Sequence, residues 1–232
     1  MGHQYGTIYI GDGTGNFSHG DGNLPPPGLL DHLGIAIGDV NNGGRDDVSF
    51  TNSNGGIEVW IYQGPNTWQD FSGMLPNSGN YEATQLFDMD VDGNLDVCGV
   101  GNRLVTIWTG DGSGTWTKAA EFNTPFPGIF EAFRVSGDCD HNGYPDIALV
   151  CRQGTWPNYR NYIHVYKESS TPSVLSINPI NPHGREHFYS GSIQFIDWIS
   201  SVPSRGATVD LAFSTSGPNG GDSIHLGSED AA

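Results

Sequence analysis

Short runs of apolar and β-branched residues, bounded by glycine or polar turn residues, recur along the first two thirds of the chain. They lie at residues 47–51, 57–62, 96–100, 104–108, 146–151 and 162–166. Runs of this length, rich in Val, Ile, Thr and aromatic residues, are typical of β-strands. No helix-forming sequence flanks them. We therefore predict an all-β protein in which the strands come in consecutive pairs.

Glycine-rich hairpins follow two of these strand pairs and lead into an aromatic residue, at Trp68 and at Trp116. A third hairpin of the same kind, at residues 7–17, ends in Phe17. The chain is therefore expected to open in the middle of a repeat, without the first half of that unit. These patterns predict about three and a half repeats, with units near residues 1–35, 36–84, 85–134 and 135–168.

An acidic loop precedes each strand pair, at residues 39–47, 88–96 and 138–146. The first aspartates of these loops lie 49 and 50 residues apart. This period is in the range of propeller blades or stacked arrays rather than of an unrepeated domain. The loops and the strands together therefore indicate a modular chain.

The composition of the loops predicts calcium binding. Calcium takes about 6 to 8 oxygen ligands, so side-chain oxygens at loop positions 1, 3, 5 and 9 can converge on it, and a glycine at position 6 permits the sharp turn. Two loops have all four ligand positions filled, by Asp88, Asp90, Asp92 and Asp96 and by Asp138, Asp140, Asn142 and Asp146. The first loop has Asp39, Asn41 and Asp47, but Gly43 at position 5. We predict two calcium sites and a weaker third.

Two other interpretations of these loops are less consistent with the sequence. Asp, Asn and Gly favour tight turns with or without metal, so a single loop would be ambiguous. Three loops in register, two of them complete, favour calcium. An EF-hand is disfavoured because the distal ligand stands at position 9 rather than as a Glu at 12, and because no helices flank the loops.

The order of these features is similar to that of a known family. An apolar residue, Gly-Asp, an acidic loop, a short strand and a Gly-Asp-Gly-x-Gly-x-aromatic hairpin resemble the FG-GAP or VCBS repeats of integrin α-subunit propellers and many secreted bacterial proteins. The resemblance covers residues 7–168 and implies four-stranded antiparallel blades with calcium in the acidic loops. It does not specify an activity, since that family includes adhesins, lectins, enzyme accessory domains and polysaccharide lyases.

A different pattern begins after a polar linker at residues 169–173. Residues 174–179, 191–198 and 207–214 alternate apolar and polar side chains, as sandwich strands do. This stretch resembles the opening half of an immunoglobulin-like or fibronectin-like module. We expect a partial β-sandwich over residues 174–232, because three or four strands fall short of the roughly seven of a complete one.

Charge, hydropathy and cysteine content bear on the expected partners, on membrane insertion and on disulfide bonding. The net charge is −17 and the chain has nine basic residues, so nucleic acid is not an expected partner. No run of about 20 apolar residues is present, so no membrane span is expected. Three cysteines leave at least one unpaired; Cys98 and Cys151 are expected either as small buried core residues or as a single disulfide.

Calcium sites of this kind indicate an extracellular or cell-surface protein, because calcium is plentiful there. The first residues lack the pattern of a signal peptide, so we expect that it was removed or that the chain is a piece of a longer one. Three and a half blades cannot close a ring, since propellers need at least four. The expected alternatives are a fragment, completion between chains, or repeats that pack without closing.

No catalytic constellation is evident among the titratable residues considered, which are His141, His164, His183, His187, Asp111 and Glu121. Tryptophans recur beside the hairpins, where aromatic residues more often pack between blades than bind sugar. Trp156, in an irregular insertion, is the best candidate for an exposed sugar-binding residue.

We therefore predict a non-catalytic calcium-binding repeat protein acting in adhesion, surface display or extracellular fibre assembly. Its expected partners are an extracellular protein, a glycan or copies of itself in a homo-oligomer or filament. The alternative is the carbohydrate-recognition domain of a secreted lectin or carbohydrate-active enzyme.

Overall fold

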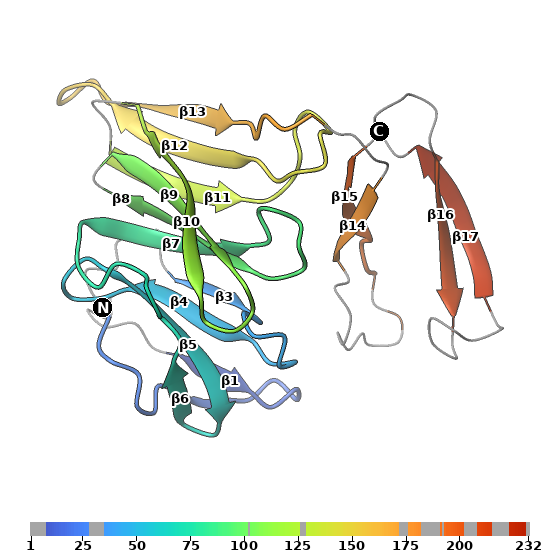
Figure 1. Cartoon of the computed structure of the whole chain (residues 1–232), viewed down its shortest axis with the longest axis horizontal. Coiled ribbons are helices and arrows are strands. Elements are labelled where there is room, and N and C mark those ends of the chain that lie inside the picture. The colour runs from blue at the N-terminus through green and yellow to red at the C-terminus, as the bar shows by residue number, and fades with distance from the viewer. Residues whose placement is uncertain are drawn as a thin grey trace. The chain divides into compact units, whose positions relative to one another are not determined.

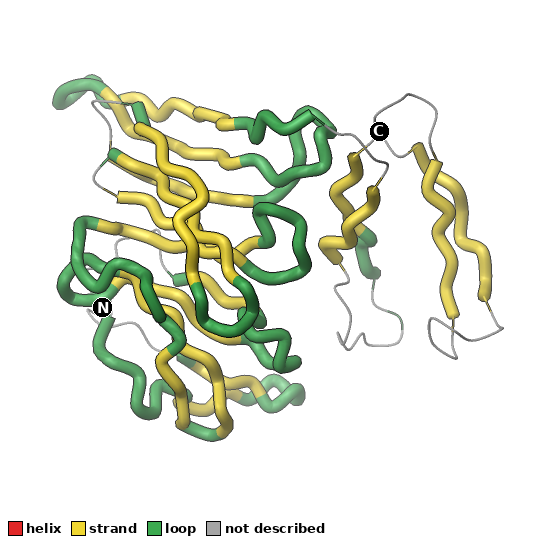
Figure 2. The backbone as a smooth tube through the Cα atoms, in the orientation of Figure 1, coloured by secondary structure: helices red, strands yellow, loops and turns green. Residues whose placement is uncertain are grey.

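The computed structural model describes residues 8–27, 35–101, 103–125, 129–171, 176–181, 191, 193–201, 208–214 and 223–230. All the regular elements in these ranges are β-strands, and they form small antiparallel sheets without a helix or a closed barrel (Figures 1 and 2). The predicted all-β fold class is confirmed. The chain divides into two compact units, residues 1–136 with 146–166, and residues 137–145 with 167–232.

The first unit contains two complete four-stranded sheets, each built from strands in consecutive order. One consists of β3 (Ala36–Gly38), β4 (Asp47–Thr51), β5 (Ile57–Gly64) and β6 (Thr67–Asp70). The other consists of β7 (Tyr81–Phe87), β8 (Asp96–Gly101), β9 (Leu104–Gly110) and β10 (Trp116–Asn123). Four antiparallel strands per repeat agree with what the resemblance to FG-GAP repeats implies.

Two smaller sheets complete the first unit. A hairpin of two strands precedes the complete sheets, and a sheet of three strands follows them. The hairpin is β1 (Tyr9–Gly11) with β2 (Phe17–His19), and the later sheet is β11 (Ile129–Val135), β12 (Ile147–Gln153) and β13 (Arg160–Tyr166). The last sheet therefore lacks, among the described residues, the counterpart of β6 and β10.

The three larger sheets share one register. The residue that follows the last aspartate of each acidic loop pairs with an aromatic residue of the next strand. The pairs are Val48 with Trp60, Val97 with Trp108, and Ile147 with Tyr166. This register defines which positions are equivalent in the three repeats.

Successive sheets pack face to face, as the stack in Figure 1 shows. Apolar side chains of alternating strand positions fill the space between them, because successive residues of a strand point to opposite faces. One cluster joins the first and second complete sheets through Val59, Ile61, Val97 and Trp116, and another joins the second to the three-stranded sheet through Val100, Val105, Leu149 and Cys151. The repeats are thus held together by their shared interfaces.

The hairpin tryptophans are core residues of this stack. Trp68 and Trp116 are 4% and 5% exposed. Each indole Nε1 donates a hydrogen bond to a carbonyl of the preceding repeat, from Trp68 to Gly20 O at 2.7 Å and from Trp116 to Phe71 O at 2.8 Å. These two aromatic residues pack between repeats, which agrees with the interpretation that the sequence favoured for them.

Cys98 and Cys151 are buried free thiols in the core beside the three-stranded sheet. Burial raises the pKa of both thiols, which keeps them protonated near neutral pH. Of the two alternatives for this pair, the structure has core residues rather than a disulfide.

The second unit contains two short antiparallel sheets, each of two strands. They are β14 (Ser176–Asn181) with β15 (Asp197–Ser201), and β16 (Thr208–Ser214) with β17 (Ser223–Asp230). The prediction of a strand over residues 191–198 is wrong for most of that range. Its described residues 193–196 have no regular structure, and β15 begins only at Asp197, where pairing with Asn181 starts. Linker residues 169–171 also lack regular structure, and 172–173 lie outside the described residues.

Candidate metal centres

The three acidic loops have the same local conformation because the first aspartate of each closes the turn. Its two carboxylate oxygens accept hydrogen bonds from backbone N–H groups four and five residues later. The acceptors and donors are Asp39 with Gly43 and Gly44, Asp88 with Asp92 and Gly93, and Asp138 with Asn142 and Gly143. The glycine at position 6 has φ of 81°, 93° or 91° in the three loops, a left-handed conformation that favours glycine.

The last aspartate of each loop is buried at the start of a strand. Asp96 is fully buried, and its Oδ2 and Oδ1 accept hydrogen bonds from Met89 N at 2.7 Å and Gly110 N at 2.9 Å. Asp47 accepts in the same way from Val40 N at 3.0 Å and Tyr62 N at 2.8 Å. This side chain therefore ties its loop to the end of a neighbouring strand. The ligand pattern of the loop predicts only the metal role of this residue, whereas its position at the start of a buried strand signals the second role.

Two groups of three carboxylates result from this arrangement. Within each group, one ligand atom from every residue lies within 4.8 Å of the others. The groups are Asp88, Asp90 and Asp96 in the second loop and Asp138, Asp140 and Asp146 in the third. Carboxylate oxygens at this spacing suit a hard cation such as calcium. Six of the eight ligands predicted for the two complete loops are thus brought together.

The residues at position 5 are placed differently from the other predicted ligands. Asp92 Oδ1 accepts a hydrogen bond from Asn94 N at 2.8 Å, and its Oδ2 accepts one from Asn94 Nδ2 at 3.1 Å. Asn142 Oδ1 accepts one from Tyr144 N at 2.9 Å, while its Nδ2 donates to Glu168 O at 2.9 Å. Both side chains close turns within their loops, and the Asp92 carboxylate belongs to neither carboxylate group.

The first loop contributes no third carboxylate to a group of this kind among the described residues. Asp39 and Asp47 are present, but Asn41 Oδ1 accepts a hydrogen bond from Gly43 N at 2.8 Å. Gly43 itself supplies no side-chain oxygen. The first loop is therefore expected to bind calcium more weakly than the other two loops, because it offers fewer carboxylate oxygens.

Burial makes these carboxylates costly to ionise without a cation. It raises the pKa of Asp96 to about 7 and that of Asp47 to about 6, against the lowering effect of their backbone hydrogen bonds. Burial also raises the pKa of Asp88 and of Asp90, and the neighbouring charge of Asp92 adds to both shifts. A bound divalent cation would offset this desolvation and repulsion.

The third loop differs from the second because a lysine side chain forms an ion pair with one of its aspartates. Lys167 Nζ lies 2.9 Å from Asp140 Oδ2, and this hydrogen-bonded ion pair holds the pKa of Asp140 below its usual range. The ammonium already neutralises part of the charge at this loop. A metal ion there would have to share Asp140 with Lys167 or displace it.

Protein stripped of metal is expected to be more stable at about pH 5.5 than at about pH 7.5. The folded pKa values of Asp96 and Asp47 lie above the unfolded value of about 3.9. Groups raised in this way contribute stability that is fully present below the unfolded pKa of about 3.9 and is lost as the pH rises through the folded pKa values of about 6 and about 7.

Calorimetric melting of the stripped protein in metal-free buffers tests this pH dependence. The loss of melting temperature on raising the pH should shrink in Asp96→Asn, which has no carboxylate to ionise at that position. A stripped wild-type protein that melts at the same or a higher temperature at the higher pH would contradict the expectation.

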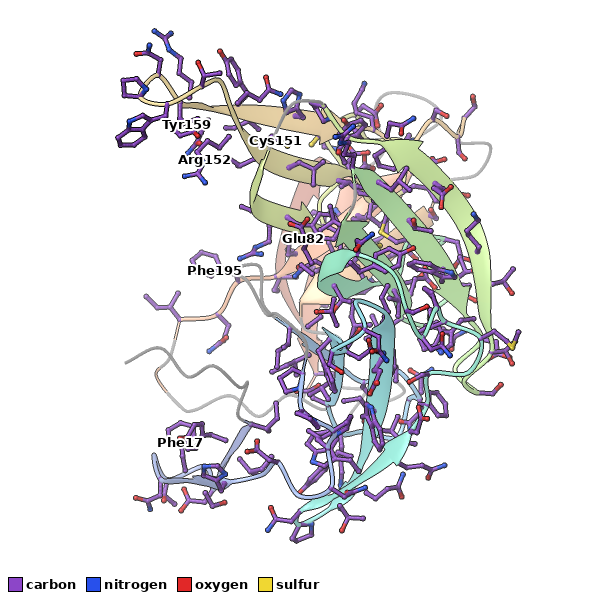
Figure 3. The ribbon with its side chains drawn as sticks, turned by 90° about the vertical axis from the view of Figure 1, so that its left-hand side faces the viewer. Phe17, Glu82, Cys151, Arg152, Tyr159 and Phe195 are labelled. Carbon is purple, nitrogen blue, oxygen red and sulfur yellow. The ribbon has the colours of Figure 1, made fainter. Side chains whose placement is uncertain are left out.

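The other residues considered for function have varied surroundings. Trp156 is 81% exposed, and its ring lies 6.3 Å from that of Tyr159, which Arg152 covers at 5.2 Å (Figure 3). Asp111 accepts hydrogen bonds from Ser113, and Glu121 forms an ion pair with Lys118. His141 is exposed and His164 is half-buried, while His183 and His187 lie outside the described residues.

One family matches this part of the chain. Residues 88–149 carry an FG-GAP-like repeat. The match begins at Asp88, the first ligand of the second loop, and ends in β12 just after the third loop. One FG-GAP-like repeat thus runs from one carboxylate group through the next. No curated protein is significantly similar to the chain in sequence, and the described residues include no helix long and apolar enough to cross a bilayer.

Proposed function

We propose that this chain is a non-catalytic, calcium-binding extracellular repeat protein that assembles with other copies of itself into fibres. The FG-GAP-like repeat supports the extracellular setting, since such repeats are typically found outside the cell. The two carboxylate groups support calcium as the stabilising ion. Adhesion and surface display are the related roles that an assembly of this kind would serve.

The observation that carries the proposal is the apolar outer face of the three-stranded sheet. In the second complete sheet the paired residues Val100 and Val105 are fully buried against the next sheet. The equivalent pair in the last sheet is Val150 and Ile163, and Ile163 is 75% exposed. Val165, on the same face, is 49% exposed. The outer face of the three-stranded sheet is therefore exposed to solvent, whereas the equivalent face of the second complete sheet is buried.

The edge of the same sheet is also open among the described residues. β13 pairs with β12 only, whereas its counterparts β5 and β9 each have a fourth strand beside them. An unpaired strand edge presents a row of free backbone donors and acceptors that another chain can use. The open face and the open edge therefore adjoin each other.

The opposite end of the stack presents the complementary surface. Phe17 occupies the hairpin position of Trp68 and Trp116, whose rings are buried against the preceding repeat. Phe17 is 71% exposed and Tyr9 is 55% exposed. Figure 3 shows Phe17 at the end of the stack away from Tyr159 and Arg152. We therefore assign the β1–β2 hairpin of a second copy as the occupant of the β12–β13 face, a head-to-tail contact that propagates into a filament.

Substitution of Ile163 by Lys is expected to reduce the assembly to single chains of 24.9 kDa. A charge at a 75% exposed position leaves the fold intact but cannot be buried in the proposed contact without a large cost. Light scattering of both proteins in calcium measures the change. Phe17→Lys should have the same effect from the other side of the contact.

Ile193→Lys is the matched control, because Ile193 is an 86% exposed isoleucine of the second unit and should leave assembly unchanged. The proposal fails if the wild-type protein in calcium has the molar mass of one chain. It also fails if Ile163→Lys assembles as the wild type does.

A further inference from the structure

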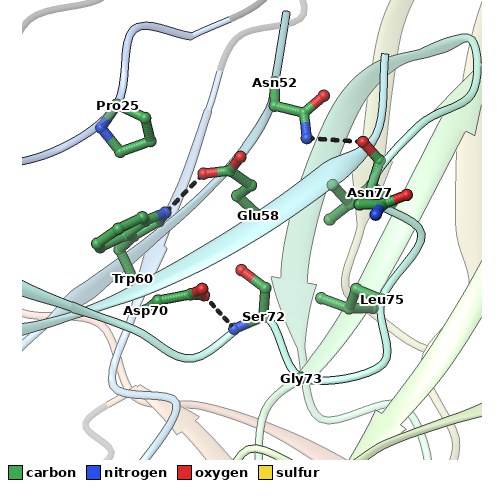
Figure 4. A pocket seen from close by; sticks show the side chains of 10 residues that line it. Pro25, Asn52, Glu58, Trp60, Asp70, Ser72, Gly73, Leu75 and Asn77 are labelled. Carbon is green, nitrogen blue, oxygen red and sulfur yellow. Dashed lines mark hydrogen bonds between the residues drawn. The ribbon is translucent and has the colours of Figure 1, made fainter. Parts of the chain in front are cut away.

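An open cleft lies beside the first complete sheet, away from the acidic loops (Figure 4). Its volume is about 240 Å³. Aromatic, carboxylate, amide and hydroxyl side chains line it, among them Glu58, Trp60, Asp70, Ser72 and Asn77. We infer that this cleft binds one unit of a neutral sugar, stacked on Trp60. The inference is independent of the proposed assembly, which uses β12–β13.

Strand geometry brings the main groups to one face of the sheet. Trp60 of β5 is directly paired with Asp70 of β6, so both side chains lie on the same face. Glu58, two residues before Trp60, shares that face because strand side chains alternate. Trp60 Nε1 donates a hydrogen bond to Glu58 Oε2 at 2.7 Å, which holds the indole ring in place (Figure 4).

The face of the first complete sheet that carries Trp60 is more exposed than the equivalent face of the second complete sheet. The residue equivalent to Trp60 is Trp108, which is 6% exposed and packs edge-on against Tyr81 at 5.6 Å between ring centroids. Trp60 is only half-buried and borders the cleft. The position of Glu58 is taken by Thr106 in that repeat. The aromatic surface and the carboxylate are therefore available together in the first complete sheet and not in the second.

The hydrogen-bonding groups of the cleft suit hydroxyls. Asp70 Oδ1 accepts a bond from Ser72 N at 2.8 Å, while its Oδ2 accepts none from the described residues. Asn52 Nδ2 donates to the backbone oxygen of Asn77 at 3.1 Å, which positions the exposed Asn77 side chain. Sugar hydroxyls both donate and accept, so they match a carboxylate and an amide that line the same cleft, and the indole provides an apolar face for the ring.

The charge of the cleft disfavours anionic ligands. No Lys or Arg is among its lining residues, so a phosphate or an acidic sugar would meet only carboxylates. An ammonium could donate to the carboxylates and to the Asn77 amide oxygen and lie against the indole, so a cationic ligand is included in the titration. A neutral polyhydroxyl ring uses all of these groups. The volume of about 240 Å³ limits the occupant to about one ring.

Titration of the full chain with glucose, galactose, mannose and N-acetylglucosamine tests the inference. Indole N–H signals in two-dimensional NMR report each tryptophan separately, and Trp60→Phe assigns the signal of interest. We expect the Trp60 signal to shift with at least one of these sugars, with a dissociation constant on the order of 1 mM. Trp60→Ala should abolish the binding, and Asp70→Asn should weaken it about tenfold.

Trp156→Ala is the matched control, since it removes an exposed tryptophan far along the chain and should leave the dissociation constant unchanged. Asp70→Asn and Asn77→Ala change exposed side chains only, so they decide the matter if Trp60→Ala does not fold. The inference is overturned if no sugar moves the Trp60 signal, if binding survives in Trp60→Ala, if Asp70→Asn leaves the dissociation constant unchanged, or if binding depends on Trp156. A response to lysine amide with none to the sugars would also overturn it and indicate a cation site.

Discussion

Removal of calcium is expected to lower the melting temperature of this protein by about 10 to 20 °C. An ion that binds only the native state stabilises it by about 2.7 kcal/mol at a concentration 100 times its dissociation constant. The carboxylate groups of the second and third loops would together contribute about 5 kcal/mol. In a protein of this size each kcal/mol corresponds to about 2–4 °C.

Calorimetry in calcium and then in excess chelator measures this change. Asp90→Ala provides the sharpest variant, because Asp90 is an exposed member of its carboxylate group. It should lose about half of the calcium-dependent stabilisation while its melting temperature in chelator stays near that of the wild type. Asp111→Asn, an acidic hairpin residue outside both groups, should retain the full response. Identical melting of the wild type with calcium and with chelator would rule out the proposed metal sites.

Substitution of Trp116 by Ala is expected to lower the free energy of unfolding by about 3–5 kcal/mol. The side chain is 5% exposed and belongs to the core between the two complete sheets. Its removal leaves a cavity there and also removes the hydrogen bond from Nε1 to Phe71 O. Trp116→Phe keeps a ring but loses that bond, so it should cost less than the alanine variant.

Urea unfolding followed by circular dichroism measures these differences in calcium. Trp156→Ala is the control, because an 81% exposed tryptophan should change the free energy of unfolding by less than about 0.5 kcal/mol. Equal unfolding midpoints for Trp116→Ala and Trp156→Ala would show that the packing between repeats does not depend on the hairpin aromatic residue.

Much of this fold follows from local sequence. The run from Asp96 to Val100 begins with a loop ligand and continues with short, mostly apolar residues, and it forms β8 at the predicted place. Gly93 and Gly143 occupy left-handed turns, as position 6 of the loop requires. Asp88, Asp90 and Asp96 converge because a tight loop of nine residues brings its own alternate side chains together. Such features depend on contacts between residues that are close in sequence.

Other features could not be inferred in this way. The ligand pattern does not reveal that backbone N–H groups of the following turn donate to the side-chain oxygens of Asp92 and Asn142. The strand expected over 191–198 is shorter because pairing with β14 begins only at Asp197. Trp60 and Trp108 have the same place in their repeats, yet one borders a cleft and the other is buried.

The residue pattern alone therefore establishes the period of the repeats, their strands and the acidic residues that gather in the loops, since each arises within one repeat. Only the packing of sheets against one another decides which of several equivalent residues are open. Burial depends on whether a neighbouring sheet covers a given face, and that neighbour is distant in sequence. Phe17, Trp60 and Ile163 thus differ from their counterparts through their neighbours and not through their local pattern.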